Sequence, residues 1–290
     1  MKSRIILYIS IIGILVFSFS NAFAQDEPEE DTGIKPVRAA FESSVLIDNQ
    51  TTLVPAKGTF EFMIQHRFGT VENGISDLYG LYAPSNIRLG FTYTIMDKFG
   101  PLSIGFGTTK DNRYLDFNVK YAILQQTRNG KIPVSITYFG NMGIKAQGEK
   151  EELPNGNSSD RYSYFHQVLI SRKLSTRLTV QIAPSLSHFN VVEKEMKNDH
   201  IAIAIGGRFK FSDQSSIILN VDQPITKHTA YNPQPNVSIG IEISTSAHAF
   251  QVFLTNYSSI VPQQNNVYNN KDPWSGDFLI GFNITRLWNF

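Results

Sequence analysis

The sequence contains no cysteine among its 290 residues. Disulfide bonds, cysteine nucleophiles, cysteine metal ligands and a lipid anchor on cysteine are therefore excluded. The chain also lacks an excess of charge of one sign, because 26 Lys and Arg residues nearly balance 25 Asp and Glu residues. A near-neutral chain has no general electrostatic attraction for nucleic acid, and we expect no nucleic-acid partner.

Long apolar runs are lacking after the first residues of the chain. Lys2 and Arg4 precede an apolar run over residues 5–19, and residues 22–24 read Ala-Phe-Ala. A basic start, an apolar middle and a small-x-small site predict a cleaved secretory signal peptide over residues 1–24. A retained membrane helix is the alternative, but the run is short and acidic residues follow it directly.

What the sequence does contain is a strong period-two pattern at its end. Over residues 278–290, apolar side chains alternate with smaller or polar ones, and the last letter is aromatic. A β-barrel needs its last strand to pair with its first, so this end cannot fray. We assign barrel closure and recognition by the outer-membrane assembly machinery to Phe282, Ile284, Trp288 and Phe290.

Similar alternation recurs in eleven earlier segments after Gly58. The twelve segments predict an all-β fold, an antiparallel up-and-down transmembrane β-barrel over residues 58–290. Long and short connections alternate, as in outer-membrane barrels with short periplasmic turns. The short connection at residues 109–113 breaks this rule and leaves ten or fourteen strands as alternatives. A secreted β-sandwich is the main soluble alternative, but it does not explain the connection lengths or the aromatic end.

Several stretches carry a family resemblance. They read FESSVLIDNQTTLVPAKGTFEFMIQHRFGT, LYAPSNIRLGF, GFGTTKDNRYLDFNVKYAILQQTR, VSITYFGN and HAFQVFLTN. On these stretches the chain resembles a family of bacterial outer-membrane β-barrels of uncharacterised function, over most of residues 41–290. The resemblance implies a barrel in the outer membrane of a Gram-negative bacterium, in contact with its lipid. It supplies no activity and no site residues.

The inward faces of the predicted strands hold polar and charged side chains of both signs. Such a lining suits a water-filled channel, and it equally suits a closed interior in which opposite charges pair. The small residues Ala202, Ala204 and Gly206 leave room beside Arg208 for either a passage or a plug. The candidate lumen-lining residues are Glu61, Arg67, Arg88, Asp116, Lys120, Arg208 and Glu242.

The segment before the barrel, residues 25–57, is expected to lie in the periplasm, where both chain termini are predicted to be. Its acidic start at residues 26–31 predicts partial disorder. Residues 39–54 are mildly apolar, with Phe41, Leu46 and Ile47 among them. Because these side chains need a partner that buries them, we favour a barrel cap over a simple lead-in.

Catalytic candidates are few. A wall hydrolase would use His66, or His166 with Ser163 nearby, but that serine is predicted on the opposite face of the strand. A rim hydrolase would use His188, His200 or His228 with Asp199 or Asp222 to activate water. Histidine pairs with metal-ligand spacing are missing from the sequence, and the acidic residues Glu149, Glu151 and Glu152 lack a calcium-loop pattern. We therefore expect no metal, no cofactor and no enzymatic activity.

Three functional hypotheses remain. The first is a small-solute channel or transporter without a chemical step. A closed barrel serving as scaffold or receptor is the second, with the loops at residues 147–160 and 261–274 contacting an extracellular or periplasmic protein. The third is the rim or wall hydrolase. A barrel fold by itself does not choose among them.

Overall fold

Twelve β-strands form one closed antiparallel barrel in the computed structural model, which describes residues 35–148 and 153–290. The predicted signal peptide, the acidic residues 26–31 and Glu149, Glu151 and Glu152 lie outside the described residues. The strand number of twelve agrees with the sequence pattern, and ten and fourteen are wrong. The barrel strands are β3 (Thr59–Thr70), β4 (Asn86–Met96), β5 (Leu102–Thr109), β6 (Tyr114–Leu124), β7 (Ser135–Lys145), β8 (Tyr162–Lys173), β9 (Leu178–Phe189), β10 (Asp199–Lys210), β11 (Ser215–Pro224), β12 (Asn236–Ser244), β13 (His248–Thr255) and β14 (Leu279–Asn289).

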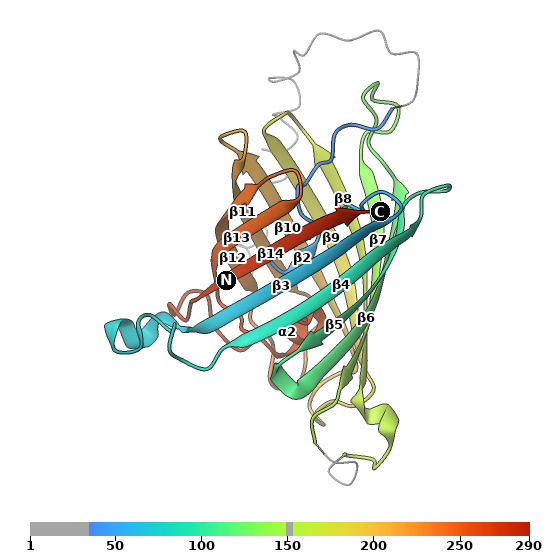
Figure 1. Ribbon diagram of the computed structural model, residues 1–290. Coiled ribbons are helices and arrows are strands. Elements are labelled where there is room, and N and C mark those ends of the chain that lie inside the picture. Colours follow the sequence, from blue (N-terminus) through green and yellow to red (C-terminus); the bar gives the residue numbers. More distant parts are fainter. Residues whose placement is uncertain (1–34, 149–152) are drawn as a thin grey trace.

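Closure joins the last strand to the first, and β14 and β3 lie side by side in Figure 1. Phe282 pairs with His66, Ile284 with Ile64, and Trp288 with Phe60. The Trp288 and Phe60 rings are 5.7 Å apart between centroids. Phe290 follows the strand, and its N–H donates to the carbonyl of Gly58 at 3.2 Å. The four residues assigned to closure thus lie at or beside the seam.

The two rims of the barrel differ in their connections (Figure 1). We call the rim with the C-terminus the turn end and the opposite rim the loop end. The loop end carries η2 (Val71–Asp77), η3 (Asp111–Arg113), η5 (Ser158–Arg161) and helix α2 (Pro262–Tyr268). Among the described residues, no helix is long and apolar enough to cross a membrane. The short connection between β5 and β6, at residues 110–113, is the exception foreseen from the sequence, and it holds η3.

Side chains alternate between the outer and inner faces of each strand, as the period of two requires. On β12, Ile239, Ile241 and Ile243 are about half exposed, whereas Ser238 and Glu242 are buried. The inner face is not uniformly polar, however. An apolar cluster also lies there, formed by Phe139, Phe165, Leu169, Ala183 and Ala204. Phe165 and Leu169, which blurred the alternation of their strand, are among its members.

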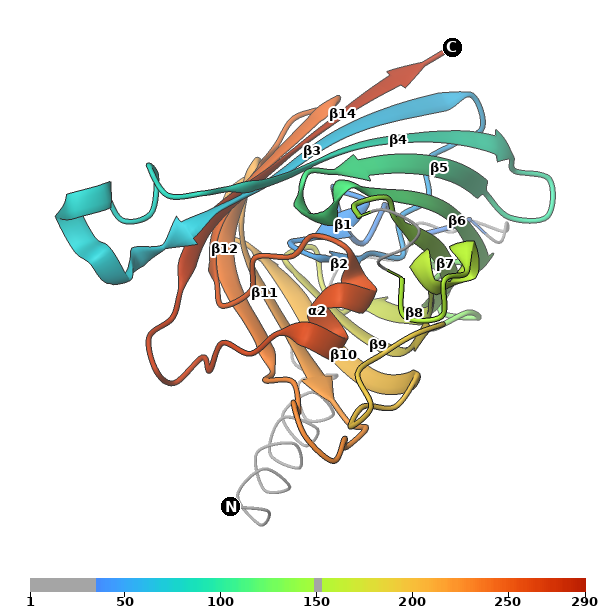
Figure 2. The ribbon, with the colours of Figure 1, turned by 90° about the horizontal axis from the view of Figure 1, so that it is seen from below.

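The lumen is occupied. A small hairpin of β1 (Val45–Leu46) and β2 (Asn49–Gln50) lies inside the ring of strands, and helix α2 lies across the loop end. Figure 2 looks into the barrel from that end and shows both elements. We call residues 40–54, which include the hairpin, the plug. Most residues of the plug are buried, whereas the residues before it are mainly exposed.

Candidate functional site: the occupied lumen

The plug reaches the lumen from the turn end. Before it, Pro36 forms a β-bridge with Thr127 in the connection between β6 and β7. The N–H of Val37 donates to the carbonyl of Gln126 at 2.8 Å. This contact fixes the point at which the chain turns inward. The structure therefore places residues 40–54 within the barrel, deeper than a cap beneath its mouth.

An apolar socket in the wall receives the plug. Leu46, Ile47 and Phe41 pack with Ile218 of β11 and Phe253 of β13, and all five are almost fully buried. Gly206 on β10 provides the space, since a Cβ there would lie 2.5 Å from Cδ2 of Leu46. The room predicted beside the small residues of β10 is thus filled by a plug side chain. Burying a leucine of this kind contributes about 1.5–3 kcal/mol.

Polar side chains of the wall bind the backbone of the plug, which has few partners of its own. Lys120 donates to the carbonyl of Ser44 at 2.9 Å, and Gln181 donates to that of Gln50 at 2.8 Å. Gln251 donates to the carbonyl of Val45 at 2.9 Å and accepts from the N–H of Ile47 at 3.2 Å. Buried backbone groups need such partners, so the wall replaces the strands that a hairpin would otherwise pair with.

The turn of the hairpin is strained. Ile47 has a φ of 61°, which is rare for a β-branched residue. Its carbonyl accepts hydrogen bonds from Asn283 at 2.7 Å and from Arg67 at 3.4 Å. Such a conformation costs roughly 1–3 kcal/mol and persists only where surrounding contacts hold it. The wall therefore stabilises a hairpin that its own sequence does not favour.

The seven candidate lumen residues all lie on the inner face, and each is engaged. Arg88 pairs with Asp116 at 2.7 Å. Arg208 pairs with Glu242 at 2.9 Å and also reaches Glu42, before the hairpin, at 3.4 Å. These charged side chains could have surrounded a water column, but they pair with each other along the inner face of the wall.

The other three of these residues contact the plug directly. Glu61 accepts from the Ser44 hydroxyl at 2.6 Å, and Lys120 binds the Ser44 carbonyl. Arg67 is fully buried, stacks 4.6 Å from the centre of the Phe253 ring and lies 3.7 Å from Asp48. These positions were predicted to line the lumen, but the groups that they contact were not predicted.

Helix α2 enters from the loop end and meets the plug. Asn265 on α2 donates to the Asp48 carboxylate in the hairpin turn at 2.5 Å. Gln263 donates to Asn141 at 3.1 Å and to Ser163 at 3.2 Å. This loop was expected to contact an outside protein, and its inward fold was not predicted. Its apolar residues Tyr257, Ile260, Val261 and Val267 were the available signal, since all are buried.

A small cavity lies between plug and wall. It is bordered by Ser44, Glu61 and Lys120 and has a volume of about 30 Å³. That is room for about two water molecules. Several buried polar atoms at this boundary have no protein partner among the described residues: Glu61 Oε2, Arg67 Nε, Gln167 Oε1, Gln181 Oε1 and Asn265 Oδ1.

The histidines form no hydrolytic arrangement among the described residues. His188 pairs with the exposed Asp199 at 2.8 Å, and His200 lies 3.0 Å from His228 between ring nitrogens. None of the described histidine rings is hydrogen-bonded to a serine or threonine hydroxyl, the contact that activates such a nucleophile. Burial lowers the pKa of His228, which lies in the connection after β11. This is the cause expected for a packed imidazole.

Three further expectations concern individual side chains. Asp222 was a candidate at the rim, but it is buried in the lumen, where Asn49 of the plug donates to it at 2.5 Å. The period-two pattern also placed Asp222 on the inner face, and that placement is the one the structure shows. His66 and His166 face outward as expected: His66 stacks on Phe282 with centroids 5.0 Å apart, and His166 bonds the Tyr138 hydroxyl at 2.7 Å.

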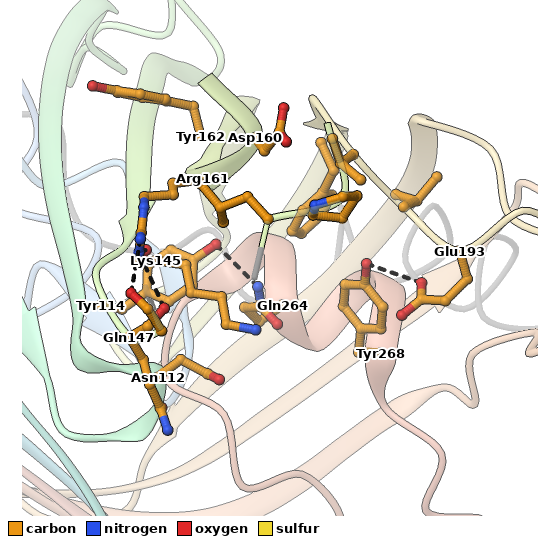
Figure 3. A pocket seen from close by; sticks show the side chains of 16 residues that line it. Asn112, Tyr114, Lys145, Gln147, Asp160, Arg161, Tyr162, Glu193, Gln264 and Tyr268 are labelled. Atoms are coloured by element: carbon orange, nitrogen blue, oxygen red, sulfur yellow. Dashed lines mark hydrogen bonds between the residues drawn. The ribbon is translucent and has the colours of Figure 1, made fainter. Parts of the chain in front are cut away.

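A second cavity opens at the loop end and measures about 710 Å³ (Figure 3). The connections after β7 and β9 and the outer side of α2 line it. Gln264 of α2 donates to the Tyr114 hydroxyl at 3.0 Å, and the Tyr268 hydroxyl lies 3.4 Å from the Glu193 carboxylate. Burial raises the pKa of Tyr268, with Glu193 as a further cause, so its hydroxyl remains protonated. The loops at residues 147–160 and 261–274 both contribute to this cavity.

Comparison with known proteins gives the family. Residues 41–288 match the family described as membrane bound beta barrel domain (DUF5777). The chain belongs to this family of membrane-bound β-barrels. The matched range begins within the plug, so the segment that fills the lumen is part of the family's own domain. No curated protein matched the sequence.

Solved structures share the fold at low sequence identity. An outer-membrane channel from Pseudomonas putida F1 superposes with a TM-score of 0.54 and 9% identity, covering 81% of this chain and 97% of that one. The KdgM porin superposes with a TM-score of 0.46 and 9% identity, covering 80% and 99% of the two chains. At such identity the likeness concerns the barrel architecture alone.

Proposed function

We propose that this protein is a non-enzymatic channel for small solutes in the outer membrane of a Gram-negative bacterium, closed at rest by its plug. One observation carries the proposal: the barrel wall is complete without the plug. No residue of the plug takes part in the strand pairings that close the barrel. If the plug left, the wall would remain and expose a lumen of polar and charged side chains, which water hydrates readily.

Features of the docked plug favour its release. The strained turn at Ile47 relaxes when the hairpin leaves the wall. The polar atoms that lack a protein partner at the boundary would gain water, and each such buried group costs about 1–3 kcal/mol. The apolar socket around Leu46 and the hydrogen bonds from the wall to the plug backbone oppose release.

The two rims support an orientation for the proposed channel. Short turns and both termini of the barrel domain face the periplasm in outer-membrane barrels, and long loops face outward. In this orientation the plug reaches the lumen from the periplasmic side, and α2 covers the outer side. A periplasmic partner could then act on the segment before the plug.

The test is conductance in planar bilayers. Full-length protein should be closed for most of the recording, and a variant lacking residues 40–54 should conduct steadily. Replacing Arg88 by Ala in the deletion variant should change its ion selectivity, because Arg88 would then line the open lumen. A deletion variant that is folded, as judged by heat-modifiable migration, and still does not conduct would refute the channel.

A closed barrel acting as a receptor is the second candidate. The cavity at the loop end favours it, because two of the longest loops converge there with helix α2. A receptor of this kind should bind its partner even if the barrel does not conduct. Cross-linking on intact cells, followed by shortening of the loop at residues 153–157, tests it: loss of a specific cross-linked partner supports a receptor, and unchanged cross-links oppose it.

A further inference from the structure

The cavity at the loop end is separate from the plugged lumen. None of its lining residues belongs to the plug, and its volume of about 710 Å³ is within the range of roughly 300–1,000 Å³ typical of small-molecule sites. Figure 3 shows side chains from η5, from the start of β6 and from α2 converging on it. The cavity therefore has the size of a ligand site.

Aromatic rings form one part of the lining. Phe189 and Tyr268 meet edge to face, with centroids 5.4 Å apart and planes at 90°. Tyr114 and Tyr162 belong to the same lining. Tyrosine combines a flat apolar face with a polar hydroxyl, so it can stack on C–H groups and hydrogen-bond nearby hydroxyls. A ligand that presents both kinds of group at short intervals suits these rings.

Hydrogen-bonding groups supply the rest. Gln264 uses its amide nitrogen on Tyr114, and its amide oxygen accepts no hydrogen bond from the described residues. Three further lining side chains have no hydrogen-bond partner among the described residues: Asn112, Gln147 and Lys145. Amides both donate and accept, as does a hydroxyl group. These groups are available to a ligand rich in hydroxyls.

The charges of the described lining residues balance. Lys145 and Arg161 are cationic, and Asp160 and Glu193 are anionic. Arg161 donates to the carbonyls of Lys145, Gln147 and Gly148 at 2.8–3.1 Å and thereby holds the loop backbone. Asp160 accepts from the Asn155 N–H at 2.8 Å. An ion would gain little from a balanced lining and would lose its hydration, so a neutral ligand is favoured.

We propose that this cavity binds a neutral, hydroxyl-rich solute of the oligosaccharide class. Tyr268 and Phe189 give the stacking surface, and Asn112, Gln147 and Gln264 bind hydroxyls. In the proposed channel it is the outer capture site for the solute, and this role alone rests on the proposed function. The binding itself requires no conductance.

Isothermal titration on the purified full chain tests the ligand class. The detergent must lack a sugar headgroup, because a maltoside would compete. Maltotriose and cellotriose are the neutral probes, trigalacturonate the anionic one and the chitosan trimer the cationic one. We expect a neutral trisaccharide to bind at least about tenfold more tightly than both charged probes. Failure of both neutral probes to bind up to about 10 mM, or equal binding of a charged probe, overturns the proposal.

Matched variants test the residues. Tyr268→Ala and Gln264→Ala should each weaken binding about tenfold, whereas Tyr268→Phe, which keeps the ring, should stay within about threefold of the natural chain. Tyr82→Ala is the control, because Tyr82 lies in another loop of the same rim, is 80% exposed and does not line the cavity. An equal loss in the Tyr82 variant, or full affinity in Tyr268→Ala, contradicts the site.

Failures of the two proposals can be told apart. A deletion variant that does not conduct refutes the channel and leaves the titration result unchanged. Absence of saccharide binding refutes the capture site and leaves the conductance result unchanged.

Discussion

Two elements fill the lumen, and they are held in different ways. The plug is an extended segment, and wall side chains bind its backbone carbonyls at Ala40, Ser44, Val45, Ile47, Gln50 and Thr52. Helix α2 contacts its surroundings through side chains such as Gln263 and Asn265. An extended segment needs a host for its backbone groups, whereas a helix pairs part of its backbone within itself. The wall is therefore complementary to the plug in particular.

This difference predicts that the plug makes the larger contribution to closing the lumen and that α2 makes the smaller one. The polar residues of the wall serve the plug backbone from strands around most of the barrel. By contrast, α2 holds the plug through the single Asn265–Asp48 hydrogen bond among the described residues. Changes at the plug should therefore alter conductance more than changes at α2.

The largest effect is expected at Gly206. In Gly206→Leu the new side chain collides with Leu46 in its socket, because even a Cβ would lie 2.5 Å from Leu46 Cδ2. Overpacking of this kind costs about 1–3 kcal/mol, so the plug should leave and conductance should approach that of the deletion variant. Gly207→Leu is the control, because Gly207 lies on the outer face. Conductance that stays at the level of the natural chain in Gly206→Leu would show that the socket does not hold the plug.

A reversible disulfide bond between the plug and β8 should have the next largest effect on conductance. The Thr52 and Ser171 hydroxyl oxygens lie 2.5 Å apart across the boundary between plug and β8. Because the chain has no cysteine, Thr52→Cys with Ser171→Cys can form only one disulfide within the chain. Oxidation should abolish openings driven by high voltage, and reductant should restore them. Each single substitution serves as a control, and openings that persist after complete oxidation would exclude the plug as the gate.

A smaller effect is expected at the junction of the two elements. Asn265→Ala removes the hydrogen bond to Asp48, and a hydrogen bond of this kind contributes about 0.5–1.5 kcal/mol. The ratio of open to closed time should rise by up to about tenfold, well below the rise in Gly206→Leu. Tyr82→Ala is the control, because Tyr82 is 80% exposed in another loop of the same rim, and it should leave this ratio unchanged. Equal ratios of open to closed time in Asn265→Ala and Gly206→Leu would show that α2 contributes as much as the plug to closing the lumen.

The smallest effect on conductance is expected at the C-terminus. Phe290 is 87% exposed and contacts neither lumen element, so its deletion should not alter opening. We expect it instead to lower the amount of protein inserted into the outer membrane, because assembly uses the aromatic end. Membrane-fraction yield and heat-modifiable migration measure this. Normal insertion without Phe290 would refute its role in assembly.

Much of the wall could be predicted from local pattern alone. Period-two alternation gave the strand number, and it placed Arg88, Asp116, Arg208 and Glu242 on the inner face. These features depend on a backbone geometry that repeats every two residues. Seam closure followed as well, since a barrel permits no free edge. The inward fold of α2 was missed because a short apolar stretch inside a long loop carries no periodicity.

The sequence by itself determined the barrel and the faces of its strands; only the tertiary structure decided what fills it. The physical reason is that a polar lining can hydrate a water column or bind a buried backbone with the same side chains. The sequence pattern is the same in either case for Lys120, Gln181 and Gln251. Their partners in the plug are far from them along the chain. Gly206 likewise became informative only once Leu46 was seen to lie against it.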